Sequence, residues 1–497
     1  MRALGWALAL LVHLALLAYA FPLAVVFGDL PYGTPDYQTH YHQVVTLLQA
    51  LDGLGRLWVY DPTFLAGYPT GLVFDLDNNG LFWFVYLARG LGLATPAAFN
   101  LFALVGAAIA PLLVWLASRA LGASARAQLW TLWLAVLLWH LDATSHFCRV
   151  AGMISFSVSA ALCVVALACF DRLLREEARP WPLWTATAIS LSLALLIHVW
   201  AFATLAAPMI ALYVWRARHL RLAAHARVGA LAAVALLVNA HWLAPALSQL
   251  GVITPSARVG QATPLVLLTD FLELAIDPEA TGNTVQRTLL RFLALFGAIA
   301  ALTEGRRRGA PWALGGALGL GWLLLLTYAG ALVPGLRETE PYRFAVPLAL
   351  WAAVIAGPWC AEHLSLRTLR AQPRWLQACA LAALLALAPR ALAQITDAIP
   401  ELSSQPPLPG RAASYRMAPV HPSFLAVAER LKTLPGDGRV LVEWWPLAEY
   451  LAWAQERPIV GGFPDRRLPH RLRVELGIAG DVEDFGRIRR SCSGRQQ

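Results

Sequence analysis

A succession of long apolar runs constrains this chain more than any other feature of its sequence. A helix needs about 20 apolar residues to cross the hydrocarbon core of a bilayer. Eleven runs of suitable length can be marked along the 497 residues, which are 58% hydrophobic and 14% charged. We therefore predict an all-α polytopic membrane protein with about eleven transmembrane helices, because a soluble fold of this length needs less apolar surface. The predicted spans are 3–27, 96–119, 127–142, 152–171, 182–198, 199–215, 228–247, 288–303, 310–332, 342–360 and 375–395.

The arginines indicate the orientation in the membrane. Lys432 is the only lysine, so the net charge of +9 comes almost wholly from arginine. Short loops rich in arginine stay in the cytoplasm, which explains the basic balance better than nucleic-acid binding does. We expect a multi-pass protein of the bacterial cytoplasmic membrane, with the N-terminus inside and the C-terminus outside. The arginines of the predicted cytoplasmic loops are Arg119, Arg126, Arg172, Arg175, Arg179, Arg216, Arg218, Arg221, Arg227, Arg306, Arg307, Arg308, Arg367, Arg370 and Arg374.

Four regions are predicted along the chain. Residues 1–27 form the first transmembrane helix; Ala18-Tyr19-Ala20 resembles a signal-peptidase site, but the run stays apolar through Phe27, which favours an uncleaved span. Residues 28–80 form an extracytoplasmic loop that we expect to carry the catalytic groups. Residues 81–395 form the multi-span domain. Residues 396–497 form a small extracytoplasmic α/β appendage, which could be truncated.

Shorter signals complete the prediction of local structure. The aromatic segment 81–93 is short for a span and predicts a partly buried or interfacial helix. In the last region, 422–434 reads as an amphipathic helix and 439–444 as a strand. The six cysteines contain no CxxC pair, so we expect neither a disulfide framework nor a zinc site. The absence of Walker and GxGxxG motifs argues against an ATP-driven pump or a dinucleotide-binding enzyme.

The loop 28–80 contains the clearest helix start outside the apolar runs. Thr34 can cap, Pro35 suits the first helical position, and the charge of Asp36 favours the first turn. An apolar stripe follows at helical spacing, fit to lie on a membrane surface, and Asp52-Gly53 is the predicted end. His40 lies four residues after Asp36 and so shares its face. The stripe consists of Tyr37, Tyr41, Val44, Val45, Leu48 and Leu51.

Asp36 and His40 are the catalytic candidates, and Asp36 would act as a general base. The alternative is that Asp36 only stabilises the helix start. His42, Asp75 and Asp77 are candidates for a metal site of nitrogen and oxygen ligands, with Mg²⁺ or Mn²⁺ as the metal and no other cofactor expected. The alternatives are a solvated face for the histidines and a turn for the aspartates.

Two arginines near predicted outer span ends are candidates for binding a phosphate. Arg343 lies in Glu340-Pro341-Tyr342-Arg343-Phe344, and Arg149 lies just before the span 152–171. A guanidinium binds phosphate oxygens through two parallel hydrogen bonds. The alternative for Arg343 is an ion pair with Glu340 or an interfacial position.

Several of these segments together resemble the glycosyltransferase C superfamily. In particular they resemble a branch of bacterial and archaeal polytopic proteins, some of which are called 6-pyruvoyl-tetrahydropterin synthase-related membrane proteins. The early loop aspartate Asp36 is followed by Trp58-x-x-Asp61-Pro62 and Gly67-Tyr68-Pro69. Asn239-Ala240-His241-Trp242-Leu243-Ala244-Pro245 and Tyr342-Arg343-Phe344 are similar to two further segments of that branch, and the resemblance covers about residues 1–400.

The resemblance implies inverting transfer of a sugar from a polyprenyl-phosphate donor to an extracytoplasmic glycan, lipid or protein acceptor. The loop aspartate of the family falls on Asp36, as base or metal contact. The chain departs from the family where Tyr41-His42 follows His40 in place of leucine. Two alternatives are a transporter or flippase of lipid-linked glycans and a non-catalytic envelope-assembly protein. No nucleic-acid partner is expected.

Overall fold

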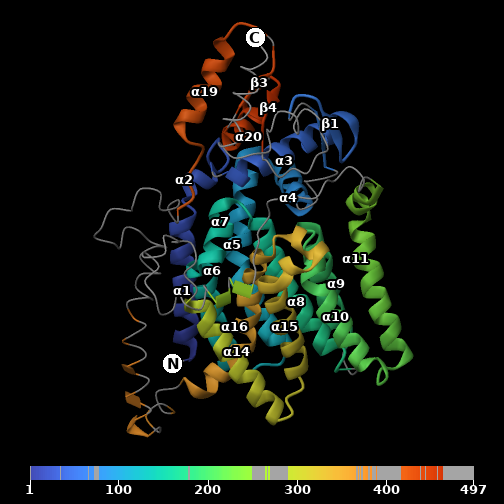
Figure 1. The fold of residues 1–497 in the computed structure, drawn as a ribbon, viewed down its shortest axis with the longest axis vertical. Coiled ribbons are helices and arrows are strands. Elements are labelled where there is room, and N and C mark those ends of the chain that lie inside the picture. The colour runs from blue at the N-terminus through green and yellow to red at the C-terminus, as the bar shows by residue number, and fades with distance from the viewer. Residues whose placement is uncertain are drawn as a thin grey trace, which may run out of the picture.

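A computed structural model gives the fold of the chain. In Figure 1 one long bundle of helices carries a cap of shorter elements at one end, and the N-terminus lies near the other end. The structure describes residues 2–33, 35–64, 67–71, 78–176, 180–248, 289–364, 416–436, 438–442, 444–455 and 457–462, with isolated positions in 264–268 and 368–388.

Ten of the predicted spans coincide with described helices, because each apolar run is long enough to form several helical turns. By length and apolar character, seven helical segments of the described chain could cross a membrane, so this is a multi-pass membrane protein. The predicted span 375–395 lies for the most part outside the described residues. The ten helices are α1 (Arg2–Ala20), α5 (Thr95–Ala120), α6 (Ala125–Leu141), α8 (Ile154–Leu173), α9 (Pro180–Ile197), α10 (Ala201–Ala217), α11 (Leu222–Ser248), α14 (Leu289–Arg307), α15 (Ala313–Ala329) and α16 (Ala345–His363).

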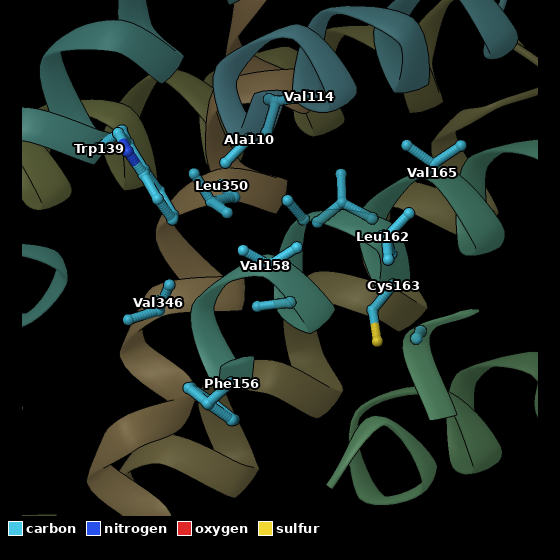
Figure 2. Packing of buried hydrophobic residues seen from close by; sticks show 14 of the residues in the cluster. Ala110, Val114, Trp139, Phe156, Val158, Leu162, Cys163, Val165, Val346 and Leu350 are labelled. Carbon is cyan, nitrogen blue, oxygen red and sulfur yellow. The ribbon is translucent and has the colours of Figure 1, made fainter. Parts of the chain in front are cut away.

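Helices α8 and α16 form the centre of the bundle. The apolar window of α8 is 100% buried and that of α16 is 89% buried. Figure 2 shows side chains of α8, such as Phe156 and Val158, facing Val346 and Leu350 of α16. Gly106 of α5 lets α8 approach closely, since a Cβ there would lie 2.5 Å from Cγ2 of Val158. These two helices therefore give the cap a rigid base.

The first apolar run does not form one continuous span. Helix α1 ends at Ala20, and a short helix α2 (Leu23–Val26) follows Pro22. Proline lacks the N–H that would continue the helical ladder, and its ring clashes with the preceding turn. The prediction of a single span over 3–27 is wrong in this respect.

The first loop folds into the helix α3 (Pro35–Leu54), a hairpin of β1 (Val59–Asp61) and β2 (Tyr68–Thr70), and the helix α4 (Asn79–Gly90). The predicted start of α3 is correct, although Thr34 lies outside the described residues. Its end is two residues later than predicted: Leu54 is last, and Gly55 follows with φ +62°. A left-handed glycine after the last turn is a common helix stop.

Helix α3 lies under a protein cover, not on an open membrane surface. The ring of Tyr41 packs edge-on between Phe99 of α5 (5.2 Å) and Trp453 (4.8 Å). On the other side of α3, His40 and His42 are only 8% and 2% exposed. The alternative of a solvated face for these histidines is therefore wrong, because Asn78 lies against His40, and Asp61 and Phe64 lie against His42.

The described C-terminal residues form α19 (Pro422–Thr433), α20 (Trp445–Ala454) and a two-stranded parallel ladder of β3 (Val440–Leu441) and β4 (Ile459–Val460). They enclose a second hydrophobic core, which also contains Phe64 of the first loop. Backbone hydrogen bonds tie the two parts together, from Gly33 N–H to the Ala418 carbonyl (2.9 Å) and from Ile459 N–H to the Thr63 carbonyl (2.6 Å). The first loop and the C-terminal elements thus form one cap, as Figure 1 shows.

Candidate active site

A short helix between two spans, α7 (Ala143–Ala151), lies at the centre of the candidate site. Asp142 ends α6 and caps α7, because its Oδ1 accepts hydrogen bonds from the backbone N–H groups of Thr144 and Ser145 (both 3.1 Å). Arg291 of α14 donates to both carboxylate oxygens of Asp142, from Nε and Nη2 at 3.1 Å each. Both side chains are fully buried, so this ion pair fixes α7 to the bundle.

Arg149, one of the two predicted phosphate ligands, lies on α7 and is 1% exposed. Its Nη1 donates to the Trp139 carbonyl (3.1 Å), and its own carbonyl accepts a hydrogen bond from the Tyr37 hydroxyl (3.0 Å). Burial, followed by the charge of Arg149, lowers the pKa of His146 to about 3. His146 is therefore neutral at physiological pH, and the positive charge of α7 resides on Arg149.

Asp36, the predicted base, lies half-buried in the first turn of α3 and against the turn that follows α7. Gly152 in that turn has φ +115°. A Cβ at Gly152 would lie 2.7 Å from the backbone nitrogen of Tyr37 and 2.8 Å from Cβ of Asp36. Only glycine permits both this backbone conformation and this approach, so Gly152 brings α7 directly against Asp36.

Four charged groups act electrostatically on the thiol of Cys148 on α7. Burial raises the pKa of Cys148 to about 12, with smaller effects from the charges of Arg343, Asp142, Asp36 and Arg291. Tyr37 is likewise close to both Arg149 and Asp36, and its pKa is raised chiefly by burial. Asp36 and Arg343 are therefore both close enough to α7 to act on Cys148, although more than 300 residues separate them in the chain.

Arg343, the second predicted phosphate ligand, lies on the 3₁₀ turn Pro341–Phe344 that leads into α16. It pairs with Glu340, which has the left-handed φ of +52°. Its guanidinium carbon lies 5.4 Å from the ring centroid of Phe156 at the start of α8. The Glu340 pair expected as an alternative is present, and the guanidinium also lies over an aromatic face at the base of the cap.

His40, the other catalytic candidate, belongs to a buried polar network. Asn78 Nδ2 lies 2.7 Å from His40 Nδ1 and donates to Gln43 Oε1 at 2.9 Å. Ser155 of α8 donates to Asn78 Oδ1 (3.1 Å). His40 and Arg343 both act electrostatically on His198, which follows α9. His40 and Arg343 therefore both lie near His198, and Asn78 holds the His40 ring in place.

His42 lies apart from this group. Its Nε2 is 3.4 Å from Asp61 Oδ2 in the hairpin, and its ring packs against Phe64. Positions 36 and 42 differ by about 120° around a helix of 3.6 residues per turn, so His42 and Asp36 face different surroundings. Asp75 and Asp77 lie outside the described residues.

A separate group of metal-type ligands lies at the far ends of α14 and α16. Donor atoms of Glu304, Glu362 and His363 lie within 4.8 Å of one another. Arg308 neutralises both glutamates, with hydrogen bonds to Glu362 at 2.9 and 3.0 Å and an ion pair with Glu304. Helix α16 begins beside Arg343 and is 19 residues long, so this group is about 28 Å from the candidate site.

The residues that hold the site together were not among those predicted from the sequence. Asp142 and Arg291 were inside predicted spans, and a charge in such a position is itself a signal of function or pairing. Gly152 carried no distinguishing signal, because its role depends on how closely α3 approaches. A second buried ion group was also missed: Asp171 with Arg175 (2.9 Å) and Arg216 (3.2 Å) at the opposite end of α8.

No protein-family model and no curated protein matches the sequence, but solved structures match the fold. The oligosaccharyltransferase AglB from Archaeoglobus fulgidus, solved with an inhibitory peptide and a dolichol-phosphate, has a TM-score of 0.57 at 13% identity, over 99% of this chain and 68% of that chain. The A. fulgidus oligosaccharyltransferase in complex with Zn and sulfate has a TM-score of 0.56 at 14% identity, over 92% and 62%. The arabinofuranosyltransferase AftD from Mycobacteria has a TM-score of 0.51 at 16% identity, over 92% and 32%.

These neighbours are glycosyltransferases of the C superfamily, and the chain has their fold. The resemblance drawn from Asp36, the Gly67-Tyr68-Pro69 segment and Tyr342-Arg343-Phe344 is thus confirmed at the level of fold. The chain spans 62% of the zinc-bound oligosaccharyltransferase chain and 32% of AftD, so parts of those proteins have no counterpart in it.

Proposed function

We propose that this protein is a membrane glycosyltransferase that moves a sugar from a polyprenyl-phosphate donor to a hydroxyl-bearing extracytoplasmic acceptor. The acceptor oxygen attacks the anomeric carbon from the face opposite the phosphate, and the bond from that carbon to the phosphate oxygen breaks. The lipid phosphate leaves with the bonding electrons, the acceptor proton passes to Asp36, and the configuration inverts.

One observation carries the proposal: Arg149 lies on α7, Asp36 lies against the turn that follows α7, and Arg343 is close enough to act on Cys148 of the same helix. Asp36 and Arg343 both act on the Cys148 thiol, and Asp36 and Arg149 both act on Tyr37. A transferase needs a base, cations for the leaving phosphate and a common location for them. A non-catalytic assembly protein has no need of this convergence, and a flippase would require its charges along the spans.

The phosphate role assigned to Arg149 and Arg343 is supported by their depth. Arg149 is 1% exposed and the Arg343 side chain is 10% exposed. Buried guanidinium groups next to a phosphate act in a low dielectric, where each charge contributes more than in water. On this proposal the donor phosphate competes with Glu340 for the Arg343 guanidinium. His40, which like Arg343 lies near His198, would be a second polar contact for the donor.

A divalent metal would supply positive charge to the leaving phosphate. His42 does not fit that role beside Asp36, because its ring faces Asp61 at 3.4 Å on another face of α3. A metal site beside Asp36 would therefore depend on Asp75 and Asp77, and the proposed mechanism uses no metal.

The orientation of the protein follows from the same proposal. The cap would be extracytoplasmic, with the N-terminus inside, the C-terminus outside and about eleven spans in a bacterial cytoplasmic membrane. The regions 1–27, 28–80, 81–395 and 396–497 would then be the first span, the catalytic loop, the multi-span domain and the outer C-terminal domain. The arginines at the opposite end of the bundle, such as Arg216 and Arg308, support this orientation.

The test is transfer from a set of radiolabelled polyprenyl-phosphate sugars, in membranes that contain either the wild type or Asp36→Asn. We expect transfer by the wild type and a loss of at least about 10³-fold in the variant, since it removes the proton acceptor. Asp52→Asn is the matched control: Asp52 lies on the same helix, but it is 52% exposed and paired with Arg89.

Equal transfer by Asp36→Asn and the wild type would refute the assignment of the base. Absence of transfer from every donor by the wild type would refute the function. Repeating the assay with a chelator tests the metal, and loss of transfer that Mg²⁺ or Mn²⁺ restores would support it.

A further inference from the structure

A groove of about 610 Å³ opens in the cap, away from the charges around α7. Helix α3 forms its floor, the hairpin residues 59–63 form one wall, and the C-terminal end of α20 forms the other. Its volume falls in the range of about 300–1,000 Å³ that is typical of ligand sites. Two parts of the chain about 400 residues apart build it, so it exists only when the cap is assembled.

The groove is lined by neutral hydrogen-bonding groups. Thr46 and Gln49 project from α3, one and two turns beyond His42, and Gln455 lies at the opposite wall. Both amide atoms of Gln455 are buried and have no hydrogen-bond partner within the described part of the chain. A buried amide without partners is costly, and a rotation of this side chain toward the groove would let a ligand with both a donor and an acceptor satisfy it.

Two aromatic rings also border the groove. Trp453 is held in place, because its Nε1 donates to Gln38 Oε1 (3.1 Å) and its ring packs edge-on against Tyr41 and Tyr450. Tyr60 is 57% exposed, and its hydroxyl lies over Gly67, where a Cβ would overlap it. Fixed aromatic faces offer apolar contact to the C–H faces of a ring at low entropic cost.

The described lining of the groove offers an ionic ligand no unpaired charge. Asp61 supplies the sole carboxylate among its described lining residues. Its Oδ1 accepts from the N–H and the hydroxyl of Thr63 (2.8 and 2.6 Å), and its Oδ2 faces His42. A phosphate would meet this carboxylate without a compensating arginine or lysine on the described lining. A neutral ligand with many hydroxyl groups satisfies both the amides and the aromatic rings.

We propose that this groove binds a neutral oligosaccharide. The groove begins at His42, about 9 Å along α3 from Asp36, and continues to Gln49, about 20 Å from Asp36. It would therefore hold sugar units remote from the reacting hydroxyl. Its assignment to the acceptor rests on the proposed transferase function, whereas oligosaccharide binding itself does not.

The test uses the full chain in detergent or nanodiscs and a panel of neutral oligosaccharides of four to six units, with binding measured by calorimetry and by saturation-transfer NMR. Thr46→Trp fills the groove and Gln455→Leu removes the unsatisfied amide. We expect each to weaken binding at least tenfold. Thr433→Trp, on an exposed position of α19, should bind like the wild type.

The outcomes separate this proposal from the transferase function. Oligosaccharide binding that is blocked by Thr46→Trp supports the groove, even in a protein without transfer activity. Failure of the wild type to bind any member of the panel overturns it, as does unchanged binding by Thr46→Trp, even when transfer is observed. Binding of an unglycosylated peptide in the groove, in place of the sugars, also overturns it.

Discussion

Asp142 and Arg291 lie 149 residues apart in the chain and form a two-point ion pair, with both nitrogen–oxygen distances 3.1 Å. The Arg291 guanidinium also donates to the Thr144 hydroxyl and lies 5.8 Å from the ring centroid of Tyr342. One contact thus links α7, the start of α14 and the turn that carries Arg343.

Breaking this pair should destabilise the protein strongly. Removing one partner of a buried pair leaves an uncompensated charge and costs about 3–5 kcal/mol. We expect Asp142→Leu to lower the unfolding temperature in detergent markedly, and the double variant Asp142→Leu/Arg291→Met to recover most of the loss. Asp52→Leu is the control, since the exposed Asp52–Arg89 pair should contribute at most about 1 kcal/mol. Equal unfolding temperatures for Asp142→Leu and Asp52→Leu would contradict the prediction.

Gly152→Ala should lower the transfer rate by more than its added backbone strain alone explains. The substitution forces a Cβ against the backbone of Tyr37 and against Asp36, and it adds about 1–2 kcal/mol of left-handed backbone strain. Gly122→Ala separates the two effects, because Gly122 has φ +86° and a Cβ added there would meet nothing within 4 Å. We expect at least a tenfold loss of transfer for Gly152→Ala only. Similar rates for the two variants would show that α7 need not touch Asp36.

The pair of His42 and Asp61 predicts a pH dependence of stability. Burial raises the pKa of Asp61, but hydrogen bonds from His42 and Thr63 outweigh it, so the net pKa is lowered. The folded state then binds this proton less tightly than the unfolded state does. The stabilisation is present above the unfolded pKa of about 3.9 and is lost as pH falls through the folded pKa. The wild-type unfolding temperature should fall more steeply between about pH 5 and 3 than that of Asp61→Asn; parallel curves would contradict this.

Cys148 should be unreactive in the folded protein. It is 1% exposed and its pKa is raised from 9.0 to about 12, so the thiolate fraction at pH 8 falls by about 10³-fold. Labelling with N-ethylmaleimide, read by mass spectrometry of the Cys148 peptide, should be slow until the protein unfolds. Gly152→Ala should accelerate it by loosening the contact of α7 with α3. Rapid labelling of the native wild type would show that the site around α7 is open.

The helices could be predicted because their signal is local. An apolar run of span length has to satisfy its backbone hydrogen bonds within one helix, and Pro35 with Asp36 marks the start of α3 without reference to the rest of the fold. Pro22 is a local signal too, because it follows the end of α1 at Ala20 and interrupts a run that stays apolar to Phe27.

The candidate residues could be selected from the sequence, but their neighbours could not. Asp36, Arg149 and Arg343 stand out by charge and position, but the sequence does not show that Arg149 lies on α7 or that Asp36 lies against the turn after it. The surroundings of His42 came from Asp61 and from a C-terminal segment about 400 residues away, and no local pattern predicts such a contact.

By itself the sequence determined a multi-pass helical membrane protein and the loops in which its arginines cluster, because hydropathy and charge act locally on each segment. The tertiary structure alone decided that the turn after α7 packs against Asp36, that Asp142 neutralises Arg291 and that the C-terminal elements cover α3. These relationships depend on packing between segments distant in the chain. A single glycine, Gly152, sets how closely α7 approaches α3, and a buried charge such as Arg291 is stable only beside its partner Asp142.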